Sequence, residues 1–213
     1  MSQQNTQEVT NKIFTAANVI SFVRLCLVPV FMVLLLGNNN VAAAVVFAIA
    51  AGTDFVDGQV ARRTNTVSKL GQLLDPTVDR LLMICAVVGL LVVSRLPMWV
   101  VVLVLCRDVL LLLGGAYLLK KWAVRVDVIF LGKIATTLLF IGLFGLILNM
   151  PLIPGLGITT LPFFPGFSTD AVSWGIWFIY IGLFIGIFTT LYYILKAYRL
   201  YQRAKRRRAK GKL

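Results

Sequence analysis

Carboxylates gather in one short stretch of this chain. Four of the eight acidic residues lie within 26 positions: Asp54, Asp57, Asp75 and Asp79. Positions three or four apart share a face of a helix, so the first two carboxylates would share one face and the last two another. The connection from Arg63 to Lys69 is short enough to make the two helices antiparallel neighbours. We therefore expect four carboxylates around one pocket.

Such a pocket predicts a metal site that binds phosphate. Ionised carboxylates are not stable unpaired in a low-dielectric environment. Hard divalent cations such as Mg²⁺, Mn²⁺ or Ca²⁺ accept oxygen ligands, and two of them can hold a phosphate during displacement. Small side chains on the same faces leave room for a bulky ligand, and neighbouring cations can counter its charge. The small residues are Gly58, Ala61 and Gly71, and the cations are Arg62 with Arg63 or Lys69.

A purely structural alternative is that the aspartates form ion pairs inside the bundle. Their partners would be Arg24, Arg80 or Arg107. For a single aspartate the two interpretations are balanced. Four carboxylates with small residues interleaved on matching faces favour the ligand site. The chain has no His, which excludes imidazole ligands and imidazole bases.

The elements that position these residues are predicted to be membrane helices. The hydrophobic fraction is 59% and the mean hydropathy is +0.90, which is too apolar for an ordinary soluble domain. Because lipid-exposed backbone must satisfy its own hydrogen bonds, we expect an all-α membrane protein. Six windows are long and apolar enough to span: about 18–37, 41–62, 70–94, 97–119, 128–150 and 171–195.

Basic residues predict the orientation of the six helices. They concentrate in alternate connections, at Arg62 to Lys69 and Lys120 to Arg125, and in the tail, where nine of the last 18 residues are Lys or Arg. The positive-inside rule then places both termini in the cytoplasm. We expect residues 1–17 to be an N-terminal segment, 18–195 the catalytic bundle and 196–213 a basic tail. The tail either enforces orientation or binds anionic lipid. Nucleic-acid binding is disfavoured because no reader module accompanies the charges.

The aspartate pattern also resembles a known family. The run Asp54-x2-Asp57-Gly58-x2-Ala61-Arg62-x8-Gly71-x3-Asp75-x3-Asp79 resembles the signature of the CDP-alcohol phosphatidyltransferases, at every position. The resemblance implies a six-helix enzyme, usually a homodimer, that binds CDP-diacylglycerol at the cytoplasmic face of the cell membrane. It implies two Mg²⁺ or Mn²⁺ ions held by the four aspartates, with Asp79 also the general base. It places Gly58, Ala61 and Gly71 beside the cytidine and Arg62 near the diphosphate.

The acceptor alcohol is predicted less directly. Related bacterial enzymes use phosphatidylglycerol, glycerol 3-phosphate or inositol phosphate. The glycerophosphate type usually shows Arg-Glu in the fourth helix and Gly-Lys-x-Lys-Thr in the fifth. This chain has Asp108 and Ala135 at those places, which favours phosphatidylglycerol, a diester. Candidate acceptor-binding cations are Arg24, Lys69, Arg80, Arg107 and Lys133.

Each of these assignments has an alternative. Arg107 and Asp108 can be a satisfied pair, and Lys133 or Arg24 can snorkel to the interface. A cation or proton transporter would also place carboxylates within spans. Transporter carboxylates tend to lie near the midplane, often with internal repeats, whereas this cluster lies at one membrane face and the halves show no repeat. The enzyme is therefore the favoured prediction.

Overall fold

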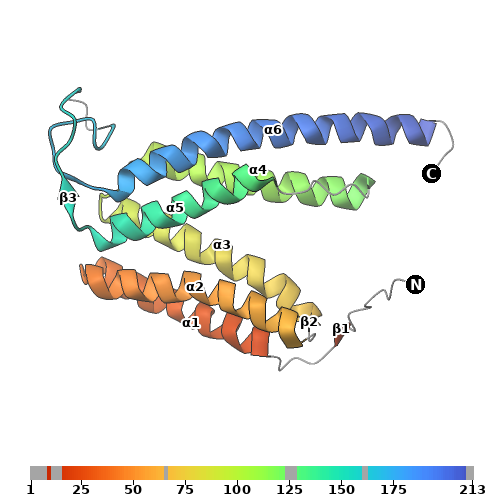
Figure 1. The fold of residues 1–213 in the computed structure, drawn as a ribbon, viewed down its shortest axis with the longest axis horizontal. Helices are drawn as coiled ribbons and strands as arrows, with labels where there is room; N and C mark the ends of the chain where they lie inside the picture. The colour runs from red at the N-terminus through yellow and green to blue at the C-terminus, as the bar shows by residue number, and fades with distance from the viewer. Residues whose placement is uncertain (1–8, 11–15, 65–66, 123–128, 160–162, 210–213) are drawn as a thin grey trace. The chain divides into compact units, whose positions relative to one another are not determined.

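The computed structural model describes residues 9–10, 16–64, 67–122, 129–159 and 163–209. Side chains are described at 22–53, 77–115, 117, 129–159, 163–199 and 201–202. The described part contains six long helices (Figure 1), in agreement with the six predicted windows. They are α1 (Ala16–Leu36), α2 (Asn40–Thr64), α3 (Lys69–Val92), α4 (Met98–Trp122), α5 (Phe130–Leu148) and α6 (Gly175–Ala209).

Three of these helices are long and apolar enough, over described residues, to be candidate membrane spans. They comprise Met98–Gly115, Phe130–Leu148 and Gly175–Arg199, while Phe22–Leu36 and Asn40–Thr53 are shorter apolar segments. The chain is therefore a mostly helical membrane protein. That all six helices span, with both termini on one side, remains a prediction.

The helices depart from the sequence prediction in two places. Helix α6 continues to Ala209, beyond the expected end near residue 195, because Lys and Arg are good helix formers and extend it past the apolar stretch. The same helix also begins later than expected, at Gly175 instead of near residue 171.

Short strands were not expected in an all-α chain. Strand β1 (Val9–Thr10) pairs in parallel with β2 (Val67–Ser68), and β3 (Leu152–Ile153) pairs antiparallel with β4 (Val172–Ser173). Each has two residues, so the strands close connections rather than build a sheet.

The chain forms two compact units, Met1–Arg95 with Ile147–Asn149, and Leu96–Leu146 with Met150–Leu213. In the first unit α1 contacts both α2 and α3, and α2 also contacts α3. Phe31 and Phe47 pack with ring centroids 5.6 Å apart. Gly89 permits a close approach of α1 to α3, because a Cβ there would lie 2.7 Å from Leu35.

One arginine joins three segments at the end of the first unit opposite the aspartates. Arg95 follows α3 and donates to the carbonyl of Ile147 at 3.1 Å and to Asn40 Oδ1 at 2.8 Å. Burial lowers the pKa of the Arg95 guanidinium, which still remains protonated at neutral pH. The arginine thereby fixes the start of α2, the helix that carries the first two aspartates.

In the second unit α6 contacts both α4 and α5. Glycines allow close contact between α5 and α6: a Cβ on Gly142 would lie 2.8 Å from Ile179, and one on Gly175 would lie 2.4 Å from the Gly142 carbonyl. Ser173 donates to the carbonyl of Gly145 at 2.6 Å and holds the start of α6 against α5.

Candidate active site

The backbone places the predicted metal and nucleotide ligands on two contacting helices. Helices α2 and α3 contact each other within one unit. Helix α2 carries Asp54, Asp57, Gly58, Ala61 and Arg62, and α3 carries Lys69, Gly71, Asp75 and Asp79. The helical spacing expected for the signature is therefore present. The side chains of the following predicted residues lie outside the described part of the chain, so their roles remain predictions: Asp54, Asp57, Gly58, Ala61, Arg62, Lys69, Gly71 and Asp75.

Asp79 is the predicted ligand and base whose side chain the structure describes. It lies on α3, and its Oδ1 accepts a hydrogen bond from Nη1 of Arg24 on α1. The Arg24 side chain is 1% exposed and that of Asp79 is 36% exposed. The structure thus brings two predicted site residues together. It also contradicts the alternative that Arg24 snorkels to the interface, because its guanidinium is buried.

The ion-pair alternative is therefore realised for Asp79, and it leaves the ligand role possible. A carboxylate has two oxygens with several lone pairs, so pairing with an arginine and binding a metal are compatible roles for one aspartate. About one third of the side chain is accessible. Among the described side chains no group of three Cys, Asp or Glu is placed to hold a metal. Arg80, the next residue, is half-buried on α3.

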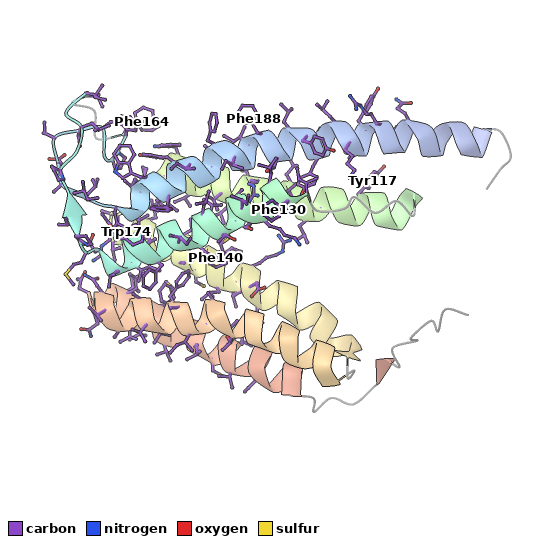
Figure 2. All side chains as sticks on the ribbon, viewed as in Figure 1. Tyr117, Phe130, Phe140, Phe164, Trp174 and Phe188 are labelled. Carbon is purple, nitrogen blue, oxygen red and sulfur yellow. The ribbon has the colours of Figure 1, made fainter. Side chains whose placement is uncertain are left out.

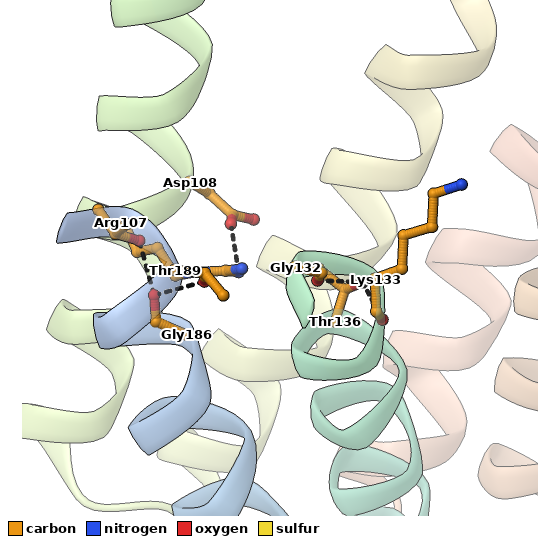
Figure 3. A network of polar contacts seen from close by, with 8 residues as sticks. Arg107, Asp108, Gly132, Lys133, Thr136, Gly186 and Thr189 are labelled. Atoms are coloured by element: carbon orange, nitrogen blue, oxygen red, sulfur yellow. Dashed lines mark hydrogen bonds and ion pairs between the residues drawn. The ribbon is translucent and has the colours of Figure 1, made fainter. Parts of the chain in front are cut away.

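A second polar cluster lies in the other unit, between α4 and α6 (Figure 3). Arg107 is 8% exposed and its Nη1 lies 3.3 Å from Oδ1 of Asp108, so the predicted pair is present. Arg107 packs on Gly186, where an added Cβ would lie 3.2 Å from Nε. This Nε is buried without a hydrogen-bond partner among the described residues.

Lys133 is exposed near the start of α5, where Figure 3 shows its side chain extending away from the helix. Its backbone carbonyl accepts hydrogen bonds from Thr136 at 2.9 Å and Thr137 at 3.0 Å. Tyr193 on α6 accepts a hydrogen bond from the Ile129 amide at 2.7 Å, just before α5. The exposure of Lys133 agrees with both a snorkelling lysine and a ligand contact.

Two supporting residues on α6 escaped the sequence analysis. Gly186 makes room for Arg107, and Tyr193 holds the start of α5 that carries Lys133. The sequence does contain a pattern that points to Gly186, because Gly182 and Gly186 form the small-x3-small spacing that is typical of close helix contacts in membranes. Tyr193 is one of several aromatic residues in the apolar stretch before the basic tail, and nothing in its spacing distinguishes it.

The site and fold define a membrane protein with paired helical aspartate motifs, and comparison with known proteins gives its family. The family description CDP-alcohol phosphatidyltransferase matches residues 14–188. The chain belongs to the CDP-alcohol phosphatidyltransferase family.

Individual relatives differ in the acceptor that their names imply. The chain is 37% identical over 139 residues to a protein of Streptomyces coelicolor named cardiolipin synthase (CMP-forming), covering 62% of this chain and 65% of the relative. It is 32% identical over 154 residues to a protein of Bacillus subtilis named CDP-diacylglycerol--glycerol-3-phosphate 3-phosphatidyltransferase. The match covers 65% of this chain and 79% of that relative. A protein of Mycobacterium tuberculosis named probable phosphatidylglycerophosphate synthase is 35% identical over 164 residues, and the match covers 71% of this chain and 76% of that relative. The matched region is thus just under two thirds of the Streptomyces relative's length.

Proposed function

We propose that this protein transfers a phosphatidyl group from CDP-diacylglycerol to phosphatidylglycerol, forming cardiolipin and releasing CMP. The observation that carries the proposal is the aspartate signature on two contacting helices in a chain of this family. Asp79, the last position of the signature, is about one third exposed beside a buried arginine, so a substrate can reach it. A transporter role, the alternative class, has no comparable support.

Metal binding is part of the proposal. Four carboxylates at helical spacing form the oxygen-rich donor set that Mg²⁺ and Mn²⁺ prefer. The described side chain of Asp79 fits such a role, because its carboxylate is 36% exposed beside the buried Arg24. Two ions, when bound, would supply electrostatic stabilisation of the diphosphate and of the departing CMP. Their ligands would be Asp54, Asp57, Asp75 and Asp79.

The remaining chemistry is assigned to the protein's own groups. The acceptor hydroxyl oxygen forms a bond to the lipid-side phosphorus of CDP-diacylglycerol, and the bond from that phosphorus to the bridging oxygen breaks. A carboxylate oxygen of Asp79 accepts the hydroxyl proton. Arg62 would neutralise diphosphate charge. Gly58, Ala61 and Gly71 would leave space for the cytidine.

Arg24 is proposed as a positioning residue. Its buried guanidinium donates a hydrogen bond to one carboxylate oxygen of Asp79 and thereby restricts the orientation of that side chain. A base must lie within hydrogen-bond reach of the proton it removes, so fixing its orientation contributes to the rate. Arg24 was considered as an acceptor contact, and its burial makes the positioning role the simpler assignment.

The choice of phosphatidylglycerol rests on α5. Ala135 stands where the glycerophosphate type usually carries its second lysine, and it is fully buried against α6 near Gly182. A lysine at this buried position would lose its hydration. Because the chain has alanine there instead, it lacks one cation that could bind the phosphate monoester of glycerol 3-phosphate. Glycerol 3-phosphate remains the second candidate, because Lys133 is exposed and Arg107 is present, and because a relative carries that name. Inositol phosphate is less favoured.

The assay is CMP release by purified enzyme with CDP-diacylglycerol and Mg²⁺ or Mn²⁺. It is run separately with phosphatidylglycerol, glycerol 3-phosphate and inositol phosphate. We expect release with phosphatidylglycerol, and none after EDTA treatment or with Asp57→Ala. Asp170→Asn, in the loop before α6, is the matched control and should keep full activity. Release with glycerol 3-phosphate alone would replace the proposed acceptor, and no release with any of the three would remove support for it.

Assembly and orientation complete the proposal. We place the site at the cytoplasmic face of the cell membrane, in a homodimer, with the basic tail near anionic lipid. The basic connections and the nine Lys or Arg residues of the tail support this orientation.

A further inference from the structure

The connection between α5 and α6 has an unusual surface for a loop. No charged residue occurs from Asn149 to Thr169, and Asp170 is the only charge between Lys133 and Lys196. Large apolar side chains on the loop are nevertheless exposed: Leu156 is 56%, Ile158 72% and Phe163 53% accessible. Figure 2 shows Phe164 among the side chains that gather there.

The described residues of the loop are held by hydrogen bonds within its own backbone and from neighbouring side chains. The amides of Leu156 and Ile158 donate to the carbonyls of Gly166 and Phe167, both at 2.9 Å. The base of the loop is closed by the β3–β4 pairing. The backbone groups in these hydrogen bonds are paired within the protein, which lowers the cost of bringing them into the boundary of a bilayer.

Aromatic residues fasten the loop to α4 and α6. Trp99 Nε1 donates to the carbonyl of Phe163 at 2.8 Å, and the hydroxyl of Tyr180 donates to the carbonyl of Pro165 at 2.9 Å. The Trp99 ring stacks on the rings of Phe163 and Tyr180, with centroid distances of 5.7 and 5.9 Å. Trp and Tyr with an apolar body and a bonded polar end are typical of membrane interfaces.

We propose that this loop is a membrane-interface anchor, whose exposed apolar side chains enter the headgroup–acyl boundary of the bilayer that α5 and α6 span. It joins two candidate spans directly, so it must lie at one membrane surface. Its uncharged apolar surface continues along α6, where Ile181 and Phe184 are also exposed. This continuity with a lipid-facing helix favours lipid over a partner protein as the occupant. The proposal is independent of the acceptor and of the catalytic residues.

The test reports the environment of single cysteines in vesicles. Cys26, Cys85 and Cys106 are replaced by Ala, and Ile158→Cys is labelled with bimane in the full-length protein. Asp170→Cys, exposed on the same loop but at a polar position, is the matched control. Both proteins are reconstituted in phosphatidylcholine–phosphatidylglycerol vesicles, with and without brominated acyl chains, after a monodisperse elution has shown that they are folded.

We expect the label at residue 158 to have blue-shifted emission, to lose fluorescence in brominated vesicles, and to be protected from aqueous iodide. The label at residue 170 should show the opposite behaviour. If iodide quenches both labels equally and bromine quenches neither, the loop lies in water and the proposal is wrong. Protection of residue 158 from both quenchers would mean that protein covers it, as in a second copy of this chain, and would also overturn the proposal.

Discussion

Asp79 and Arg24 are the paired residues of the proposed site whose side chains the structure describes. Substitution of each is expected to have a different effect. Asp79→Asn removes the proposed base while keeping size and hydrogen-bonding capacity. We expect CMP release to fall by about 10²–10⁴-fold, the usual contribution of a positioned acid or base. The measurement is turnover at saturating CDP-diacylglycerol, with Asp170→Asn as the control. Near-normal turnover would show that another group removes the proton.

Arg24→Gln tests the buried pair. Removing the arginine leaves the Asp79 carboxylate beside a space built for a cation. We expect the free energy of unfolding to fall by roughly 3 kcal/mol. This value is at the low end for a buried ion pair because the Asp79 side chain is 36% exposed. The measurement is the thermal unfolding midpoint in detergent, and Arg24→Lys, which keeps the charge, should lose less.

A double-variant cycle separates the pair from general damage at Arg24. If the two side chains are coupled, Arg24→Gln combined with Asp79→Asn should lose less stability than the sum of the two single losses. Additive losses would mean that Arg24 acts through its other contacts, and the positioning role would be lost.

At the scale of elements, glycine contacts decide how α5 and α6 pack. A Cβ on Gly175 would lie 2.4 Å from the carbonyl of Gly142 and 2.6 Å from the amide of Leu146. Both are backbone atoms, so we expect Gly175→Ala to cost about 1–3 kcal/mol by overpacking. Gly114→Ala on α4 is the matched control, because no described atom lies within 4 Å of its Cβ position. Equal midpoints for the two variants would contradict the packing described here.

The contact between α4 and α6 makes a different prediction. Gly186→Ala would place a methyl group 3.2 Å from Nε of Arg107 and displace the guanidinium. If Arg107 contacts the acceptor, we expect KM for the acceptor to rise several-fold while KM for CDP-diacylglycerol changes little. The initial rate against each substrate measures this. An unchanged acceptor KM would assign the arginine to packing alone.

At the scale of the whole molecule, orientation is the property to test. Reporter fusions after residues 158 and 213 distinguish the sides of the membrane. We expect alkaline phosphatase to be active on the first and inactive on the second, because the basic residues of the tail resist translocation. A green fluorescent protein fusion should show the reverse. Activity of phosphatase at both positions would place residues 158 and 213 on the same side of the membrane and would contradict a single span, α6, between them.

Much of this molecule follows from local patterns in the sequence. Apolar windows predicted the six helices, because a helix in lipid must be long and apolar regardless of its neighbours. The spacing of the aspartates predicted helices α2 and α3, since three- and four-residue intervals define a helix face. The family followed from the same positions. The end of α6 and the β3–β4 pairing were missed, since a basic tail and a proline-rich loop carry no comparable periodicity.

The tertiary structure decided which distant groups meet. Arg24 and Asp79 are 55 positions apart, and the sequence offered Arg24, Arg80 and Arg107 equally as ion-pair partners. Only the packing of α1 on α3 selects Arg24 and buries it. Likewise Arg107 rests on Gly186, and Trp99 stacks on Phe163, through contacts between helices. Composition and periodicity act within one element, whereas the partner of a buried charge depends on which helix lies beside it, and that is a property of the packed chain alone.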